Sequence, residues 1–455
     1  MLNEFREKIY NEYEQKRQKS KELNRMANNY LPGGDTRTAT YYSPYPHYIE
    51  KGEGCFIWDV DGNKMIDFQN NYTSLIHGHA HADTVKAVCA QIAIGSNYSA
   101  PTFSQISLAK KICERVPAID LIRFTNSGTE ATMHAVRGAR AYTNKTKIVK
   151  IEGGYHGTSD VFEASVDPDL KKAGTLNKPR PVPDSKGVPQ SVMDEVLVIP
   201  FNNIQSCKQV IEENHSEISA LIIEPVMGSA GMIEPELDYL KYLRYITEKY
   251  NILLIFDEVV TLRLAYGGAQ EYYDIYPDIT VLGKIIGGGL PIGAFGGKAE
   301  IMEMYDPLKR EMYHSGTFNG NALAMVAGVA TMDALTKDEI ARINELGAMF
   351  REGCADTFRM LGLNITINGV GSLNNIIFSG ENISEYRGVA NSYEEFNMLL
   401  SLLLIEKGIF NAPRGMFCMS TAMTKDEIQK AISAIKEGLT ELLPLIKEQS
   451  PELLF

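Results

Sequence analysis

The sequence predicts an α/β protein with a mostly parallel sheet and a smaller α+β domain. Between about residues 104 and 256, short apolar runs alternate with stretches whose apolar residues recur at helical spacing. This alternation is typical of a parallel sheet covered by helices on both faces. After about residue 321, long helical stretches predominate and indicate the second domain. A chain of 455 residues with 44% hydrophobic content is long enough for two or three domains.

The first 75 residues are expected to form a segment that joins the smaller domain. Residues 1 to about 28 carry apolar side chains at helical spacing, which predicts one amphipathic helix. A Pro-Gly-Gly breaker follows it. The stretch 55–63 predicts a hairpin whose turn lies at Asp61 and Gly62.

Residues 76–320 are expected to form the large domain and residues 321–455 the small C-terminal domain. In the large domain the expected strands are 121–125, 147–151, 195–199, 219–223 and 252–256, and the expected helices are 104–116, 128–143, 204–214 and 236–250. The stretch 165–192 predicts a loop. In the small domain the expected helices are 321–335, 338–360, 393–407 and 425–442, and the expected strands lie near 364–367 and 373–378.

The composition argues against several classes of protein. A formal net charge of −12 does not suit a nucleic-acid-binding protein, which needs a basic face. The six cysteines are scattered without a Cys-x-x-Cys pair, as is typical of reduced thiols. The sequence starts without an apolar secretory segment, and no run approaches the roughly 20 apolar residues of a membrane span. We therefore expect a cytoplasmic protein.

Lys284 and Asp257 carry the strongest chemical signal. Lys284 follows a short apolar run and precedes three glycines. A lysine among small residues at a strand end can be desolvated, which lowers its pKa and frees its amine to attack an aldehyde. Asp257 ends another apolar run, and a buried aspartate can keep the nitrogen of a pyridine cofactor protonated. Together the two residues predict a pyridoxal phosphate (PLP) enzyme.

Small polar residues form a candidate anion site. Ser127, Gly128 and Thr129 stand between an expected strand and the helix 128–143, and free N–H groups at a helix start bind phosphate. The same residues could simply cap the helix. Tyr155 follows the next expected strand between glycines, where it could stack on a planar ring.

Two other kinds of site have weaker support. The glycines at 287–289 do not fit the G-x-G-x-x-G pattern. They also do not fit the nucleotide phosphate-binding loop, in which a lysine is followed by serine or threonine. His77, His79 and His81 alternate, as metal ligands on one face of a strand do. Because no carboxylate or cysteine stands at ligand spacing, a polar turn is the simpler interpretation, and we expect no metal.

Taken in order, six motifs resemble the class III aminotransferases of PLP fold type I. They are Asn-Ser-Gly-Thr-Glu-Ala at 126–131, Gly-Tyr-His-Gly at 154–157, Ile-Glu-Pro at 223–225, Phe-Asp-Glu-Val at 256–259, Lys284, and Gly-Thr-Phe-Asn-Gly-Asn at 316–321. The resemblance runs from about residue 30 to 440 and implies a seven-stranded, mostly parallel sheet in the large domain. The sequence is most similar to the branch that holds glutamate-1-semialdehyde aminomutase and the β-amino-acid (β-phenylalanine type) aminotransferases.

The resemblance implies a role for each matching residue around the cofactor ring. Lys284 would bind PLP covalently and later move the substrate proton, and Asp257 would pair with the pyridine nitrogen. Tyr155 would stack on one face of the ring and Val259 would press on the other. Glu224 would lie near the catalytic lysine.

The same resemblance implies how the phosphate is held. Ser127, Gly128 and Thr129 would bind it from one subunit. Thr317 would reach the phosphate of the neighbouring subunit, which makes a homodimer the minimal active unit.

Two arginines bear on the choice of substrate. Arg37 matches the carboxylate-binding arginine of the β-amino-acid enzymes, and a guanidinium fork grips a carboxylate through two hydrogen bonds. Arg414 resembles a second arginine of that branch, which could receive the carboxylate of 2-oxoglutarate. Either arginine could instead be a solvated surface charge. Four tyrosines between residues 41 and 48 either line an aromatic pocket or pack under the entry loop.

The resemblance favours an aminotransferase that moves an amino group from a β- or ω-amino acid to an oxo acid through pyridoxamine phosphate. The segment after Asp257 lacks the glycine usual in aminomutases and has Leu262 directly after Thr261. The His77 region looks equally like an aminomutase, so glutamate-1-semialdehyde 2,1-aminomutase activity stays the alternative. A ligand sensor without catalysis is disfavoured, because Lys284 and Asp257 are both present.

Overall fold

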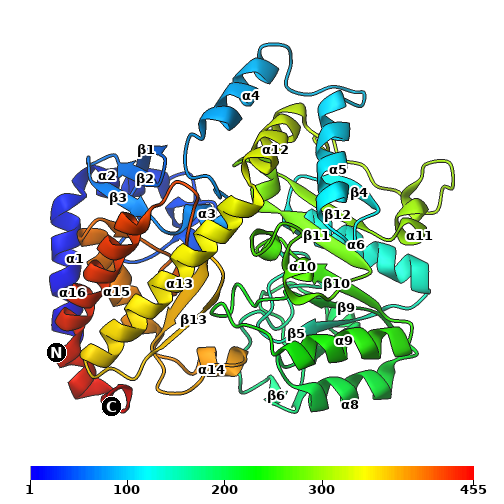
Figure 1. The fold of residues 1–455 in the computed structure, drawn as a ribbon. Helices are drawn as coiled ribbons and strands as arrows, with labels where there is room; N and C mark the ends of the chain where they lie inside the picture. Colours follow the sequence, from blue (N-terminus) through cyan, green and yellow to red (C-terminus); the bar gives the residue numbers. More distant parts are fainter. Residues whose placement is uncertain (1) are drawn as a thin grey trace.

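A seven-stranded sheet forms the centre of the larger part of the molecule (Figure 1). The computed structural model describes residues 2–455. The strand order is β4-β12-β11-β10-β9-β5-β8, and all neighbours are parallel except β12, which runs antiparallel to both β11 and β4. The strands are β4 Leu121–Thr125, β5 Lys147–Ile151, β8 Val196–Ile199, β9 Ile218–Ile223, β10 Leu253–Asp257, β11 Ile279–Gly283 and β12 Gly293–Gly297. The predicted α/β class and mostly parallel sheet are confirmed.

Helices cover both faces of this sheet. On one face, Ala220 and Ile222 of β9 pack with the helix α6 (Gly128–Thr143). On the other, Leu221 and Ile223 pack with residues of α8 and α9. Because successive side chains of a strand point to opposite faces, this alternation buries β9 completely. The other helices of this part are α4 Ala82–Ile92, α5 Phe103–Arg115, α7 Gln190–Met193, α8 Ile204–Asn214, α9 Leu237–Lys249, α10 Ala269–Tyr273, α11 Ala299–Met302 and α12 Ala322–Ala334.

The strand β12 was not predicted. Its sequence, Gly-Ala-Phe-Gly-Gly, lacks the β-branched residues that indicate a strand. The glycines are needed for close packing: a Cβ on Gly293 would lie 2.0 Å from the Ser127 carbonyl oxygen, and one on Gly297 would lie 2.3 Å from that of Asp278. Short-range propensity therefore misses a strand that tertiary packing imposes. The expected loop at 165–192 also holds a two-stranded hairpin, β6 Gly174–Thr175 and β7 Lys178–Pro179.

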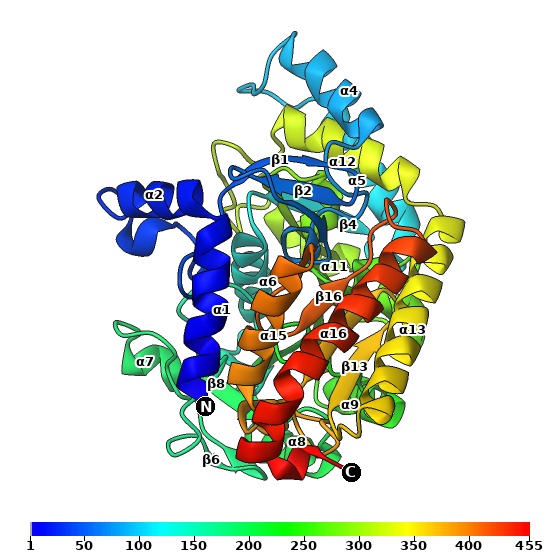
Figure 2. The ribbon, with the colours of Figure 1, turned by 90° about the vertical axis from the view of Figure 1, so that its left-hand side faces the viewer.

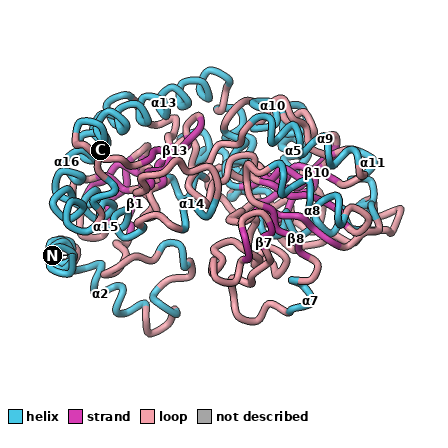
Figure 3. The backbone as a smooth tube through the Cα atoms, turned by 90° about the horizontal axis from the view of Figure 1, so that it is seen from below, coloured by secondary structure: helices cyan, strands magenta, loops and turns pink. Residues whose placement is uncertain are grey.

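The smaller part combines both ends of the chain (Figure 2). Its antiparallel sheet has the order β13-β14-β16, and a second sheet has the order β1-β2-β3-β15, in which β15 joins the amino-terminal strands in parallel. Seen from below, the long helices of this part line the edge away from the larger sheet (Figure 3). The strands are β1 Ile49–Glu53, β2 Phe56–Asp59, β3 Lys64–Asp67, β13 Thr366–Val370, β14 Leu373–Ile377, β15 Ile409–Phe410 and β16 Met416–Cys418. The helices are α1 Leu2–Lys16, α2 Gln18–Ala27, α13 Lys337–Met360, α14 Tyr386–Ala390, α15 Glu394–Glu406 and α16 Lys425–Gln449.

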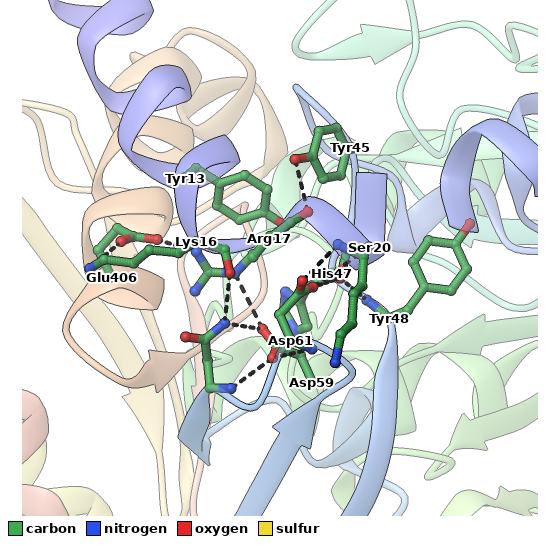
Figure 4. A network of polar contacts seen from close by, with 12 residues as sticks. Tyr13, Lys16, Arg17, Ser20, Tyr45, His47, Tyr48, Asp59, Asp61 and Glu406 are labelled. Carbon is green, nitrogen blue, oxygen red and sulfur yellow. Dashed lines mark hydrogen bonds and ion pairs between the residues drawn. The ribbon is translucent and has the colours of Figure 1, made fainter. Parts of the chain in front are cut away.

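The predicted single helix at the amino terminus is wrong, because the chain breaks at Arg17 into α1 and α2. Arg17 is 1% exposed, and its guanidinium forms ion pairs with Asp59 at the end of β2 and Glu406 at the end of α15 (Figure 4). The Asp61 carboxylate accepts the backbone N–H groups of Lys19 (2.7 Å) and Ser20 (3.0 Å), so it caps α2. This network fastens the amino-terminal segment to α15.

Of the four tyrosines between residues 41 and 48, Tyr42, Tyr45 and Tyr48 belong to the same cluster, whereas Tyr41 is exposed. Tyr42 and Tyr45 are buried. The Tyr45 hydroxyl donates to the Arg17 carbonyl (3.1 Å), and the Tyr48 hydroxyl donates to the carbonyl of Gly34 (3.3 Å). They pack under the loop that carries Arg37.

No helix within residues 2–455 is long and apolar enough to cross a membrane.

We expect Arg17→Met to destabilise the fold strongly, because it leaves the buried carboxylate of Asp59 without its cation. Breaking a buried ion pair costs about 3 to 5 kcal/mol. The matched control is Lys16→Met, since Lys16 also pairs with Glu406 (2.7 Å) but its side chain is 56% exposed, and such pairs contribute about 1 kcal/mol or less. Urea unfolding at one protein concentration measures both. Equal midpoints for the two variants would contradict the assigned role of Arg17.

Candidate active site

The predicted site residues converge on one cavity at the carboxyl edge of the large sheet. The cavity has a volume of about 830 Å³. Parallel sheets bind ligands at this edge, because the loops after each strand gather there. The predicted residues that line it are Arg37, Gly128, Thr129, Tyr155, Glu224, Asp257, Val259, Lys284 and Arg414. Ser127 and Thr317 lie outside this lining.

Lys284 begins a single 3₁₀ turn directly after β11, and its backbone is strained. Its φ is +48°, in the left-handed region that residues other than glycine rarely adopt. Burial lowers the pKa of the Lys284 ammonium; Asp257 and Glu224 oppose this shift, whereas Arg414 and Arg37 add to it. The amine is therefore held in a setting that favours its neutral, nucleophilic form.

A buried histidine that the sequence reasoning did not select holds Asp257. The Nδ1 of His156 lies 2.8 Å from Oδ2 of Asp257, and both side chains are buried. The other carboxylate oxygen accepts the backbone N–H of Val259 (3.1 Å). Burial lowers the pKa of His156, so we assign a neutral ring whose Nδ1–H donates to a carboxylate. The only signal in the sequence was the position of His156 next to Tyr155.

Glu224 follows β9 and lies between the two loops that close one side of the cavity. Its carboxylate accepts the backbone N–H of Tyr155 (2.9 Å) and of Gly228 (3.1 Å). Burial raises the pKa of Glu224 to about 7, and the nearby Asp257 carboxylate adds to the shift. The side chain fixes the segment that carries Tyr155 and is poised to exchange a proton near neutral pH.

The amino terminus of α6, which is the predicted anion-binding end, lines part of the cavity. The Ser127 hydroxyl accepts the N–H of Glu130 (3.2 Å), which makes Ser127 the helix cap. Gly128 and Thr129 face the cavity instead, and the Thr129 hydroxyl accepts the N–H of Thr158 (3.3 Å). The Ser127 side chain thus caps the helix, whereas anion binding by Gly128 and Thr129 stays a prediction.

Thr317 is exposed on a loop outside the cavity. Its carbonyl accepts a hydrogen bond from Asn97 (3.1 Å). Two residues later, Asn319 accepts one from Asn126 (2.9 Å), which does line the cavity. The loop therefore reaches the edge of the anion-binding end, while the Thr317 side chain does not enter it.

Arg37 and Arg414 come from opposite ends of the chain and meet at one ring. The guanidinium carbon of Arg37 lies 5.2 Å from the centroid of Tyr72, and that of Arg414 lies 5.6 Å from it. Arg37 also donates to the side chain of Asn71 (2.7 Å). Both arginines are exposed, and both line the cavity that holds Lys284.

The alternating histidines contact polar groups of the surrounding fold. His77 lies 2.7 Å from the Thr421 hydroxyl and 3.0 Å from the Thr331 carbonyl. His79 lies 2.7 Å from the Asp67 carboxylate, a partner that spacing along the sequence did not indicate.

The donor set of the cavity fits a phosphorylated pyridine aldehyde. Lys284 supplies an amine, Asp257 an acceptor for a ring N–H, and Tyr155 and Val259 an aromatic and a branched surface for a flat ring. These residues match the needs of such a group without any further change.

A lysine amine and a carboxylate that share one cavity at the carboxyl edge of this sheet define a PLP-dependent enzyme of fold type I. The chain belongs to the class III aminotransferases, because residues 38–439 match the family Aminotransferase class-III. Its cofactor is pyridoxal 5′-phosphate.

Similar proteins include both kinds of enzyme in the predicted branch, an aminomutase and two transaminases. The chain is 40% identical over 427 residues to a glutamate-1-semialdehyde 2,1-aminomutase of Methanosphaera stadtmanae, covering 93% of this chain and 99% of that protein. It is 42% identical to an omega-transaminase of Sphaerobacter thermophilus of known structure, with a TM-score of 0.90 and coverage of 93% and 97%. A β-phenylalanine aminotransferase of Variovorax paradoxus is 32% identical, with a TM-score of 0.90 and coverage of 98% and 99%.

We expect His156→Phe to weaken cofactor binding. It removes a hydrogen bond to a buried carboxylate, and such bonds contribute about 1.5 to 3 kcal/mol, or roughly tenfold or more in affinity. Titration of cofactor-free protein with PLP, followed by absorbance, gives the dissociation constant. His134→Phe is the matched control, because His134 is buried but lies outside the cavity lining. An unchanged affinity in His156→Phe would contradict the role of this contact.

We expect Glu224→Gln to stabilise the cofactor-free protein more at high pH. A carboxyl whose pKa is raised on folding favours the folded state below its unfolded pKa of 4.5, and this contribution is lost as the pH rises through about 7. Removing the group should therefore raise the free energy of unfolding by up to about 3 kcal/mol at pH 8.5 and by less at pH 5.5. Urea unfolding at both pH values measures the difference. The exposed Glu236→Gln is the control, and a pH-independent gain would disprove the assignment.

Proposed function

We propose that the protein is an aminotransferase that moves an amino group from a β- or ω-amino acid to an oxo acid such as 2-oxoglutarate. The observation that carries the proposal is that two guanidinium groups, those of Arg37 and Arg414, face the same cavity as Lys284. Transamination brings two carboxylate-bearing molecules to one amine in turn, and a guanidinium is the natural carboxylate partner. The similarity to an omega-transaminase and to a β-phenylalanine aminotransferase supports this reading.

In this proposal the side chains of the cavity divide the work. Bound PLP supplies an electrophilic aldehyde for the donor amine and a ring that withdraws electrons. Lys284 holds the cofactor and then moves the proton at the reacting carbon, for which its lowered pKa suits it. The Asp257 carboxylate accepts the N–H of the pyridine ring, and His156 keeps that carboxylate oriented. Arg37 receives the carboxylate of the donor and Arg414 that of the oxo acid.

A second copy of the chain completes the anion-binding end in this proposal. Thr317 is exposed and lies outside the cavity of its own chain. By the resemblance, this threonine would bind the phosphate of a neighbouring subunit, and Ser127, Gly128 and Thr129 would bind the phosphate of their own subunit. We therefore propose a homodimer with shared active sites.

Glutamate-1-semialdehyde 2,1-aminomutase activity is the second candidate. The name of the Methanosphaera relative, at 40% identity over nearly the full length, favours it, and further curated relatives at 37% to 42% identity carry the same name. The residues around the cofactor would serve both reactions, because a mutase returns the amine to an adjacent carbon of the same bound molecule. By name alone, these relatives favour the mutase over the transaminase.

A single-turnover experiment separates the two candidates. The PLP-loaded enzyme is mixed with 3-amino-3-phenylpropanoate, or with glutamate-1-semialdehyde, without any oxo acid acceptor. We expect the cofactor absorbance to shift and about one equivalent of the oxo product to form from the β-amino acid, because the amino group stays on the cofactor. Release of 5-aminolevulinate in catalytic excess from the semialdehyde would instead establish the mutase and overturn the proposal.

A further inference from the structure

Four consecutive residues other than glycine form a left-handed turn beside the two arginines. Asn70, Asn71, Tyr72 and Thr73 have φ values of 48°, 48°, 52° and 75°. The left-handed conformation brings Cβ close to the following carbonyl and costs free energy at each residue. Asparagine adopts it more readily than other residues, whereas tyrosine and threonine do so rarely. A run of this kind persists only where surrounding contacts impose it, as they often do at functional sites.

The turn is held by buried polar contacts on its inner side. One oxygen of Asp67 accepts the backbone N–H groups of Gln69 (2.8 Å) and Asn70 (2.9 Å), and the other lies 2.7 Å from His79. The Asn70 side chain donates to the carbonyl of Cys418 (2.9 Å). The inner half of the turn is therefore fixed to β16 and to the end of β3, and its outer half is presented to the cavity.

The outer half of the turn presents groups that attract cations, the Asn71 side chain and the Tyr72 ring. Asn71 accepts a hydrogen bond from Arg37 (2.7 Å), and the Tyr72 hydroxyl donates to the carbonyl of Ala39. The Tyr72 ring has the guanidinium groups of Arg37 and Arg414 within 5.2 and 5.6 Å of its centroid. Cations are attracted to the face of an aromatic ring at such distances. The ring thus offsets the repulsion of two like charges on one side of the cavity.

Within residues 2–455 neither guanidinium forms an ion pair with a carboxylate. An aspartate or glutamate in place of Tyr72 would hold the arginines more firmly but would occupy the donors that a substrate carboxylate needs. An aromatic ring holds both cations without accepting their N–H groups, so those that Arg37 does not donate to Asn71 stay available for a substrate carboxylate. This distinguishes Tyr72 from an ordinary packing residue.

We propose that Tyr72 is a positioning residue, whose ring holds Arg37 and Arg414 where they receive the carboxylates of both substrates. The inference rests on the proposed function, because it assigns the two arginines to carboxylate binding. It goes further in making the left-handed turn 70–73 the element that sets where both carboxylates bind. Loss of the ring therefore weakens donor and acceptor together rather than one of them.

The test compares Tyr72→Ala with Tyr72→Phe, which keeps the ring and removes only the hydroxyl. For the PLP-loaded enzyme, we measure KM for the donor and for the oxo acid, kcat, and, from the change in cofactor absorbance, the dissociation constant of glutarate, a dicarboxylate that cannot react. In Tyr72→Ala all three binding constants should rise about tenfold, as expected for the loss of two cation–π contacts, and kcat should fall less than about twofold. Tyr72→Phe should stay within about twofold of the parent. Tyr245→Ala, on the outer helix α9, is the control for removing a partly exposed tyrosine.

Two results would overturn the proposal. Unchanged constants in Tyr72→Ala would show that the ring does not position the arginines, and equal losses in Tyr72→Ala and Tyr72→Phe would assign the effect to the hydroxyl bond with Ala39. If Tyr72→Ala does not fold, Tyr72→Leu replaces it, since leucine fills much of the space without a ring. Failure of the parent enzyme to form an oxo product would contradict the proposed function. Glutarate binding does not require turnover, so it tests the role of Tyr72 even in that case.

Discussion

The active site depends on the burial of three ionisable groups, those of Lys284, Glu224 and Asp257, at the edge of one sheet. Removing charge from water is costly, so each group is shifted or satisfied by its neighbours. The Lys284 pKa falls and the Glu224 pKa rises to about 7. Asp257 keeps its two oxygens bonded to His156 and to the N–H of Val259. The result is an amine able to attack an aldehyde and a carboxylate able to accept a proton or an N–H group, in the same cavity.

Two strained stretches of backbone lie at this cavity. Lys284 and the turn 70–73 adopt left-handed conformations that their side chains disfavour. These conformations cost free energy. Extensive hydrophobic packing on both faces of the large sheet offsets that cost, because the strained residues lie between regular elements. In the smaller part of the molecule, the ion pairs and hydrogen bonds of Arg17 fix the amino-terminal segment that leads to Arg37.

Local signals predicted the fold class and the family but not the contacts between segments far apart in the sequence. Lys284 and Asp257 were identified because each stands at the end of an apolar run, and such positions fall at the functional edge of a parallel sheet. His156 was missed because its role depends on Asp257, 101 residues away in the sequence. The strand β12 was missed because its glycines serve packing that no short window reveals. The helix break at Arg17 likewise follows from partners at Asp59 and Glu406, which only the folded chain brings together.

Sequence identity does not decide between the two reactions, since an aminomutase at 40% and an omega-transaminase at 42% stand about equally near. A mutase and a transaminase need the same lysine, aspartate and phosphate site, and these residues dominate any comparison. The difference lies in how many carboxylates the cavity must bind and release. A mutase keeps one molecule until the amine returns to it, whereas a transaminase exchanges two. Two cations held by a ring rather than by carboxylates leave two receptors open, and this arrangement favours exchange.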